Sequence, residues 1–169
     1  MPFQRTRYDS RTGYTPNNPR QQLNEITPYL DGTLIYGVGK AWTDAIREFR
    51  DGRLKAKDPS GPIKDSFPVD NDIRLPFANP PAPRDHFLRP VKRFWRIGNP
   101  RGFENPFLLT FGVLFFRWHN YIANEIKNAN KNLNDEEIFN EARRRVIAHH
   151  QVLHVIGVNA YYSVNSKFE

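Results

Sequence analysis

Residues 101–120 read RGFENPFLLTFGVLFFRWHN, and this stretch decides the fold class because it predicts a long buried helix. Pro106 suits the first helical position, where the backbone N–H would have no intrahelical partner. We expect the helix to run to about Asn128, with a first half that is apolar on all sides and therefore buried all round. In the second half the apolar residues narrow to one stripe, made of Trp118, Ile122 and Ile126.

Two further helices are predicted, one on each side of this stretch. The later one begins after Asn134, which serves as N-cap, because the acidic residues 135–137 complement the positive end of a helix. Its inner face is expected to consist of Ile138, Ala142, Val146 and Ile147. The earlier one is short and covers about residues 42–49, with Ala45, Ile46 and Phe49 on one face.

The prolines separate the chain into two halves of different character. All fourteen lie at or before Pro106, and proline interrupts both helix interiors and strand ladders. Residues 1–106 should therefore be rich in loops, with short helices only. The predicted fold class is mainly α, with a loop-rich first half and two long helices in the second half.

Composition limits the class of protein further. The 169 residues suit one domain, and the 13 Phe, 7 Tyr and 3 Trp provide enough large rings to build a core, which excludes a wholly disordered chain. The absence of cysteine excludes a disulfide scaffold and a thiolate metal site. The first five residues lack the apolar core of a signal peptide, and the longest apolar run, residues 107–116, is shorter than the roughly 20 residues of a membrane-spanning helix.

A basic cluster accounts for part of the formal net charge of +7. Aromatic residues are interleaved with these cations, as they are in grooves that bind single-stranded nucleic acid. A solvated surface, or a loop that borders an anionic cofactor, explains the same pattern, and we favour these two readings over nucleic acid. The cluster consists of Arg84, Arg89, Lys92, Arg93, Arg96 and Arg101, with Phe87, Phe94 and Trp95 between them.

Two short motifs could bind ions. Thr27, Asp31 and Thr33 place oxygen-bearing side chains close together, as a hard cation such as Ca²⁺ requires. A calcium site usually contains more than one carboxylate, however, and from these residues alone we favour an ordinary turn capped by Asp31 and Thr33. Arg101 and Glu104 stand at the junction before the long helix. They could present a guanidinium to an anion, or simply form an ion pair at a helix start.

The histidines are the remaining candidates for metal or acid–base chemistry. His150 and His154 have the i, i+4 spacing of a metal-binding pair on a helix. His119 is expected on the rim of the long helix. For all of them we favour a structural role over a ligand role.

Three blocks of sequence, in order, resemble the animal haem peroxidase family. They are NEITPYLDGTLIYG at 24–37, RGFENPFLLTFGVLFFRWHN at 101–120 and EARRRVIAHHQ at 141–151. The similarity runs from Pro2 to Gln151 and is greatest to the peroxidase-like ectodomain of the dual oxidase branch. The resemblance implies a central slice of the animal haem peroxidase fold, haem b as cofactor, and the use of H₂O₂ to oxidise a reducing donor.

The resemblance also implies roles for single residues. Arg101 matches the catalytic arginine on the distal side of the haem, which stabilises negative charge on the departing peroxide oxygen. Glu104 matches a glutamate that many members attach to the haem through an ester. Asn105 replaces the methionine of some members, so a sulfonium link is not expected. A calcium loop is implied at Thr27, Tyr29, Asp31 and Thr33, with Tyr29 offering its carbonyl oxygen.

Other features depart from the family pattern. Neither of the family's haem histidines matches His86, His119, His149, His150 or His154, and the family's calcium site takes a further aspartate from an upstream segment. Residues 152–169 do not follow the family sequence. We therefore interpret residues 1–151 as a partial peroxidase domain and 152–169 as a divergent, poorly packed tail.

These departures set what we expect of the chain and of its parent. The chain alone is expected to be inactive, and its partner would be the rest of a longer chain. The parent would act in the response to oxidative stress, on the extracellular face of a membrane or in secreted form. The alternative interpretation is a catalytically dead, peroxidase-like scaffold or interaction module.

Overall fold

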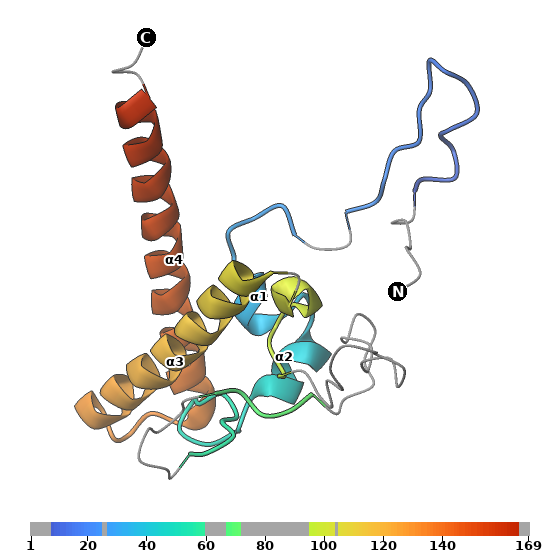
Figure 1. The fold of residues 1–169 in the computed structure, drawn as a ribbon. Helices are drawn as coiled ribbons and strands as arrows, with labels where there is room; N and C mark the ends of the chain where they lie inside the picture. Colours follow the sequence, from blue (N-terminus) through green and yellow to red (C-terminus); the bar gives the residue numbers. More distant parts are fainter. Residues whose placement is uncertain (1–7, 25–26, 60–66, 72–94, 104, 166–169) are drawn as a thin grey trace, which may run out of the picture.

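The structure is a computed structural model that describes residues 8–24, 27–59, 67–71, 95–103 and 105–165. It is mainly helical, as predicted (Figure 1). Within the described ranges, strand pairing is limited to isolated bridges such as that between Arg47 and Leu54. The helical segments are α1 (Thr33–Tyr36), α2 (Lys40–Ile46), the 3-10 helix η1 (Pro100–Phe103), α3 (Pro106–Ala129) and α4 (Asp135–Asn165).

The two long helices lie in the second half of the chain, and the bounds predicted for α3 are confirmed. Asn105 caps α3, since its Oδ1 accepts a hydrogen bond of 2.9 Å from the Leu108 amide, and Pro106 occupies the first turn. A short turn after Ala129 reverses the chain, so that α4 packs against α3 over its first half (Figure 1). The second half of α4 projects beyond the body of the molecule.

The start of α4 also follows the prediction. Asn134 Oδ1 accepts from the Glu137 amide at 3.0 Å, and Glu137 Oε2 accepts from the Asn134 amide at 2.8 Å, which together form a reciprocal capping box. The predicted inner face is buried at Ile138, Ala142 and Val146. These residues join the core that α1, α2 and α3 complete.

The prediction that the first half of α3 is buried all round is wrong for the described structure. Phe107 is 78% exposed, and Phe111 and Leu114 are exposed as well. The predicted stripe is confirmed at Ile122 and Ile126, which are buried, but it is wrong at Trp118, which is exposed while His119 beside it is buried. The inner face of α3 instead consists of Phe115, His119, Ile122 and Ile126, at the spacing of one helix face.

The short early helix was predicted to extend too far. It ends at Ile46, because Arg47 is extended and Phe49 adopts a left-handed backbone with φ 58°. Phe49 is consequently exposed and does not share a buried face with Ile46. After this change of direction, Arg47 and the Gly52 amide both donate to Asp135 at the start of α4.

The last part of α4 continues as a helix through Gly157 to Asn165. Val152, Leu153, Val155 and Ile156 are all more exposed than buried, and the structure describes no partner element over them. In the described part of the chain, α3 and α4 lack the run of apolar residues that a bilayer-crossing helix needs.

Candidate functional site

The residue predicted to be catalytic, Arg101, lies in η1, one turn ahead of α3. The Gly102 amide donates to the carbonyl of Asn99 at 2.9 Å and so closes this turn. η1 packs against α3, and the Leu34 side chain of α1 lies close to Gly102. The predicted loop-to-helix junction is therefore present, while Glu104 lies outside the described residues.

In the oxygen-bearing loop, residues 27–33, the polar side chains form local hydrogen bonds. Thr33 donates to Asp31 Oδ1 twice, from its amide at 3.1 Å and from its hydroxyl at 2.5 Å. Thr27 Oγ1 accepts from the Tyr29 amide at 3.1 Å. Thr27, Asp31 and Thr33 line one wall of a pocket of about 390 Å³, whereas the ring of Tyr29 points away from the core and is 77% exposed.

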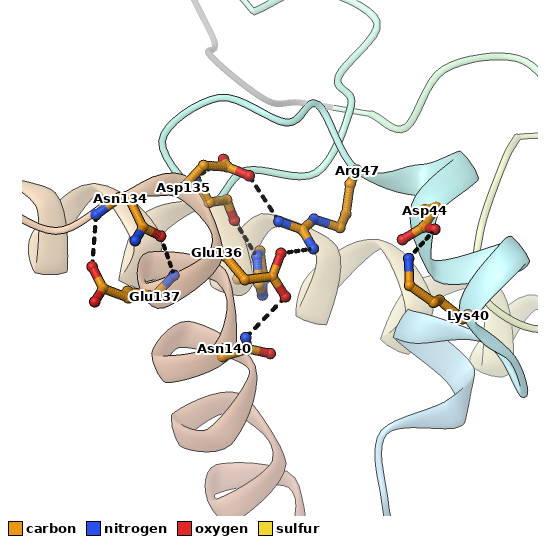
Figure 2. A network of polar contacts seen from close by, with 10 residues as sticks. Lys40, Asp44, Arg47, Asn134, Asp135, Glu136, Glu137 and Asn140 are labelled. Atoms are coloured by element: carbon orange, nitrogen blue, oxygen red, sulfur yellow. Dashed lines mark hydrogen bonds and ion pairs between the residues drawn. The ribbon is translucent and has the colours of Figure 1, made fainter.

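The same pocket is also lined by Arg47 and Glu136, which belong to the ion-pair network shown in Figure 2. The buried guanidinium donates to Asp135 at 2.7 Å and to Glu136 at 2.5 Å, and it stacks over the Phe139 ring with 4.0 Å to the centroid. These bonds lower the pKa of the Glu136 carboxyl below its ordinary value. The network joins the end of α2 to the first turn of α4.

A second network surrounds His119, which is fully buried rather than at the rim. Its Nε2 lies 2.9 Å from the carbonyl oxygen of Gly52, and its Nδ1 lies 2.8 Å from the hydroxyl of Tyr36. A carbonyl can only accept, so Nε2 carries the proton and Nδ1 accepts from the tyrosine. Burial lowers the pKa of His119 to about 4, which keeps the ring neutral. Both ring nitrogens are occupied, and His119 therefore has a structural role.

Asn120 is a buried polar residue that the sequence did not single out. Its Oδ1 accepts from the Leu54 amide at 2.8 Å, and its Nδ2 donates to the Leu54 carbonyl at 3.1 Å, so one side chain replaces a strand partner for that residue. Its place four residues after Phe116 on the same helix was the available signal. The polar side chain of an asparagine, however, argued against burial at this position.

The histidines of α4 form no described metal site. Nδ1 of His149 accepts from Trp118 Nε1 at 2.9 Å, and the His150 ring stacks edge-on against Phe115. Within the described residues no three His, Cys, Asp or Glu side chains gather around a common point. The i, i+4 spacing of His150 and His154 thus finds no third ligand there.

Most of the basic cluster, from Arg84 to Phe94, lies outside the described residues. Two members of the cluster have described contacts within the protein. Arg96 donates to the carbonyl of Ala45 at 3.0 Å, and Trp95 stacks on Phe67 with ring centroids 4.7 Å apart.

The implied cofactors fit the described residues to different degrees. The oxygens of Thr27, Asp31 and Thr33 suit a hard cation in type, and one carboxylate makes the set incomplete on its own. For haem the described residues offer the position of Arg101, whereas His119 has no free nitrogen for an iron. His119, the fully buried histidine of α3, is thus not available as a ligand to haem iron.

Comparison with known proteins gives a family match over most of the chain. The model of the family described as animal haem peroxidase matches residues 1–157. Dual oxidase 1 of Caenorhabditis elegans is 43% identical over 148 residues, which cover 88% of this chain and 10% of that protein. Human dual oxidase 2 is 40% identical over 151 residues, covering 89% of this chain and 9% of its own length. The chain thus spans about a tenth of the length of these relatives.

Solved structures agree with this match. Peroxidase A of Dictyostelium discoideum superposes with a TM-score of 0.65 at 27% identity, over 80% of this chain and 25% of that one. A fatty acid alpha-dioxygenase of Oryza sativa shares the fold at a TM-score of 0.50 and 20% identity, over 82% of this chain and 18% of its own.

Proposed function

Because this chain belongs to the animal haem peroxidase family, we propose that it forms part of a dual oxidase-type peroxidase domain that uses H₂O₂ to oxidise a reducing donor. The family is one of oxidoreductases, and the dual oxidase relatives cover almost nine-tenths of the chain. The observation that supports the proposal most is the position of the arginine turn. Arg101 lies on η1 directly ahead of α3, inside the block that matches the family.

Arg101 is the residue to which we assign the catalytic role. A guanidinium stays positively charged at any accessible pH and is planar, so it can hold a peroxide oxygen in place and stabilise the negative charge that develops as the O–O bond lengthens. Such a group is effective only where its position is fixed before the reaction. The short 3-10 helix that bears Arg101 provides a fixed backbone of this kind.

Haem b, when bound, would supply the redox chemistry, and Arg101 and Glu104 are the residues of this chain that we assign to holding it. Glu104 would attach to the haem edge, as the resemblance implies. The iron ligand and the general base would come from outside the described residues. The 169-residue chain alone is accordingly proposed to be inactive.

A calcium ion is proposed at the loop formed by Thr27, Tyr29, Asp31 and Thr33. Asp31 and Thr33 would provide side-chain oxygens, and Tyr29 would provide its carbonyl oxygen. The loop leads directly into α1, so a bound cation would order the entry to that helix. A further acidic ligand from the parent chain would complete the charge that Ca²⁺ requires.

In the parent, the domain is proposed to lie on the extracellular face of a membrane or to be secreted, and to act in the response to oxidative stress. These assignments rest on the dual oxidase relatives, of which this chain covers about a tenth. The rest of that longer chain would be the partner of the surfaces exposed here.

The direct test is Arg101→Ala in a complete peroxidase domain that contains this segment and both haem histidines. Stopped-flow mixing with H₂O₂ should show a reaction about 10²–10³ times slower, since one preorganised charge has been removed, while haem content stays near normal. Arg101→Lys should recover part of the rate. Arg145→Ala, which removes an exposed arginine paired with Glu141, is the control. An unchanged rate in Arg101→Ala would favour the scaffold interpretation.

A further inference from the structure

The side chain of Trp42 fastens the segment just ahead of the Arg101 turn to α2. The indole Nε1 of Trp42, in α2, donates a hydrogen bond of 3.0 Å to the carbonyl of Ile97, just ahead of η1. Trp42 is buried, and its ring lies against Gly37 so closely that a Cβ there would stand 2.1 Å from it. Trp42 is thus held both by its close contact with Gly37 and by its bond to Ile97.

The next residue, Gly98, is in direct contact with the backbone of α1. A Cβ on Gly98 would stand 2.4 Å from the carbonyl carbon of Ile35 and 2.5 Å from the amide nitrogen of Gly37. These neighbours are backbone atoms, which cannot rotate aside as a flexible side chain would. Only glycine therefore allows the two backbone segments to lie this close.

We propose that Trp42 and Gly98 are positioning residues for Arg101: together they fix the η1 turn against α1, and so set the place from which the guanidinium acts. The inference rests on the catalytic role proposed for Arg101. A charge that stabilises a developing negative oxygen has to be held within about 0.5 Å of its productive place. The contacts of Ile97 and Gly98 lie three to four residues before Arg101, with the closed turn of η1 between them.

The contacts of Trp42 and Gly98 also connect η1, through α1, to the oxygen-bearing loop. α1 follows that loop directly, beginning at Thr33, and ends at the backbone atoms that Gly98 contacts. Thr43 strengthens this end of α1 by donating to the carbonyl of Tyr36 at 2.8 Å. A displacement of η1 would have to move both α1 and α2, which accounts for the firmness we assign to the turn.

The first experiment measures amide hydrogen exchange in the 169-residue chain. Trp42→Phe keeps an aromatic ring and removes the bond to Ile97, so exchange at the Gly102 amide should become roughly fivefold faster than in the wild type. Trp118→Phe is the matched control, because it too removes an indole donor, that to His149, on the exposed side of α3. Loss of protection in Trp42→Phe spread evenly over all helices, or no loss at Gly102, would overturn the proposal.

The second experiment is a double-mutant cycle in the complete peroxidase domain. If Trp42 acts through Arg101, Trp42→Phe should slow the reaction with H₂O₂ about tenfold alone and add nothing to Arg101→Ala. General damage would instead slow both backgrounds equally, which would contradict the inference. A second pair of variants compares Gly98→Ala with Gly39→Ala, whose Cβ would meet open space.

The outcomes separate the two proposals. If Arg101→Ala leaves the rate unchanged, the catalytic role of Arg101 is wrong, and with it the positioning role. If Arg101→Ala slows the reaction but Trp42→Phe and Gly98→Ala match their controls, the catalytic role stands and the positioning role alone is refuted.

Discussion

The hydroxyl of Tyr36 donates a hydrogen bond of 2.8 Å to Nδ1 of His119, although 83 residues separate them in the sequence. The other ring nitrogen donates to the carbonyl of Gly52. The imidazole ring can carry only one proton in this arrangement, because a proton on Nδ1 would point at the hydroxyl proton that Tyr36 donates. The neutral histidine thus connects α1, the crossing loop and α3.

The stability of the chain should fall as the pH falls from about 6.5 to about 4. Folding lowers the pKa of His119 to about 4, mainly through burial, and Arg47, Arg143 and Arg53 add to this effect against the bond to Gly52. The unfolded chain keeps the ordinary pKa and takes up the proton first, so the free energy of unfolding drops by roughly 3 kcal/mol across this window. Urea unfolding at a series of pH values measures it.

His119→Gln should flatten this pH dependence while lowering stability at neutral pH. His150→Gln is the control, since burial lowers the pKa of His150 in the same direction but to a lesser degree. A slope in His119→Gln equal to that of the wild type would show that other groups cause the acid sensitivity.

Asn120→Ala should reduce the free energy of unfolding by roughly 3 kcal/mol. The change leaves the buried amide and carbonyl of Leu54 without partners, and each unsatisfied group costs about 1–3 kcal/mol. Asn128→Ala alters an exposed asparagine of the same helix and should stay within about 0.5 kcal/mol of the wild type. Equal effects of the two substitutions would mean that the bonds of Asn120 contribute nothing.

Calcium should stabilise the complete peroxidase domain, which supplies the further acidic ligand, through Asp31. At a calcium concentration about ten times the dissociation constant, the gain is about 1.4 kcal/mol, seen as a higher melting temperature. Asp31→Asn should abolish the gain, while Asp44→Asn, which alters an acid on the same pocket that pairs with Lys40, should retain it. Magnesium at the same concentration is the ion control. Stabilisation of Asp31→Asn by calcium to the wild-type extent would disprove the site.

The 169-residue chain should show no peroxidase turnover after addition of haemin. Both ring nitrogens of the buried His119 are occupied, and by sequence none of the five histidines of this chain matches either of the family's haem histidines. Oxidation of a chromogenic donor by H₂O₂ should therefore equal that of free haemin at the same concentration. Turnover above that background would refute the proposed inactivity.

The sequence predicted the parts of the fold that depend on neighbouring residues. Pro106 and Asn134 mark the starts of α3 and α4 through local capping, and Ile138 and Val146 follow the helix period. The buried polar residues could not be predicted in the same way. His119 was assigned to the rim because a polar side chain is buried only when partners exist, and those partners lie on segments far away in sequence.

In the candidate site, too, the features that depend on neighbouring residues could be predicted and those that depend on distant segments could not. The position of Arg101 at a helix junction was visible from Pro106 and the block around it. The contact that holds this turn against α1 could not be predicted. It depends on how closely the backbone at Gly98 approaches the backbone of α1, and neither segment has a sequence pattern that indicates this approach. The exposure of Phe107 was not predicted for a similar reason. The sequence shows that an apolar side chain favours burial, but it does not show which other segment would cover that side chain.

Several stabilising contacts join residues that are far apart in the sequence, and this separation affects the order in which the chain can fold during synthesis. Tyr36, Trp42 and Arg47 leave the ribosome early, whereas their partners at Ile97, His119 and the first turn of α4 emerge much later. Helices of four and seven residues do not persist without tertiary support. Residues 33–47 therefore gain their full set of stabilising contacts only once the start of α4 has been translated.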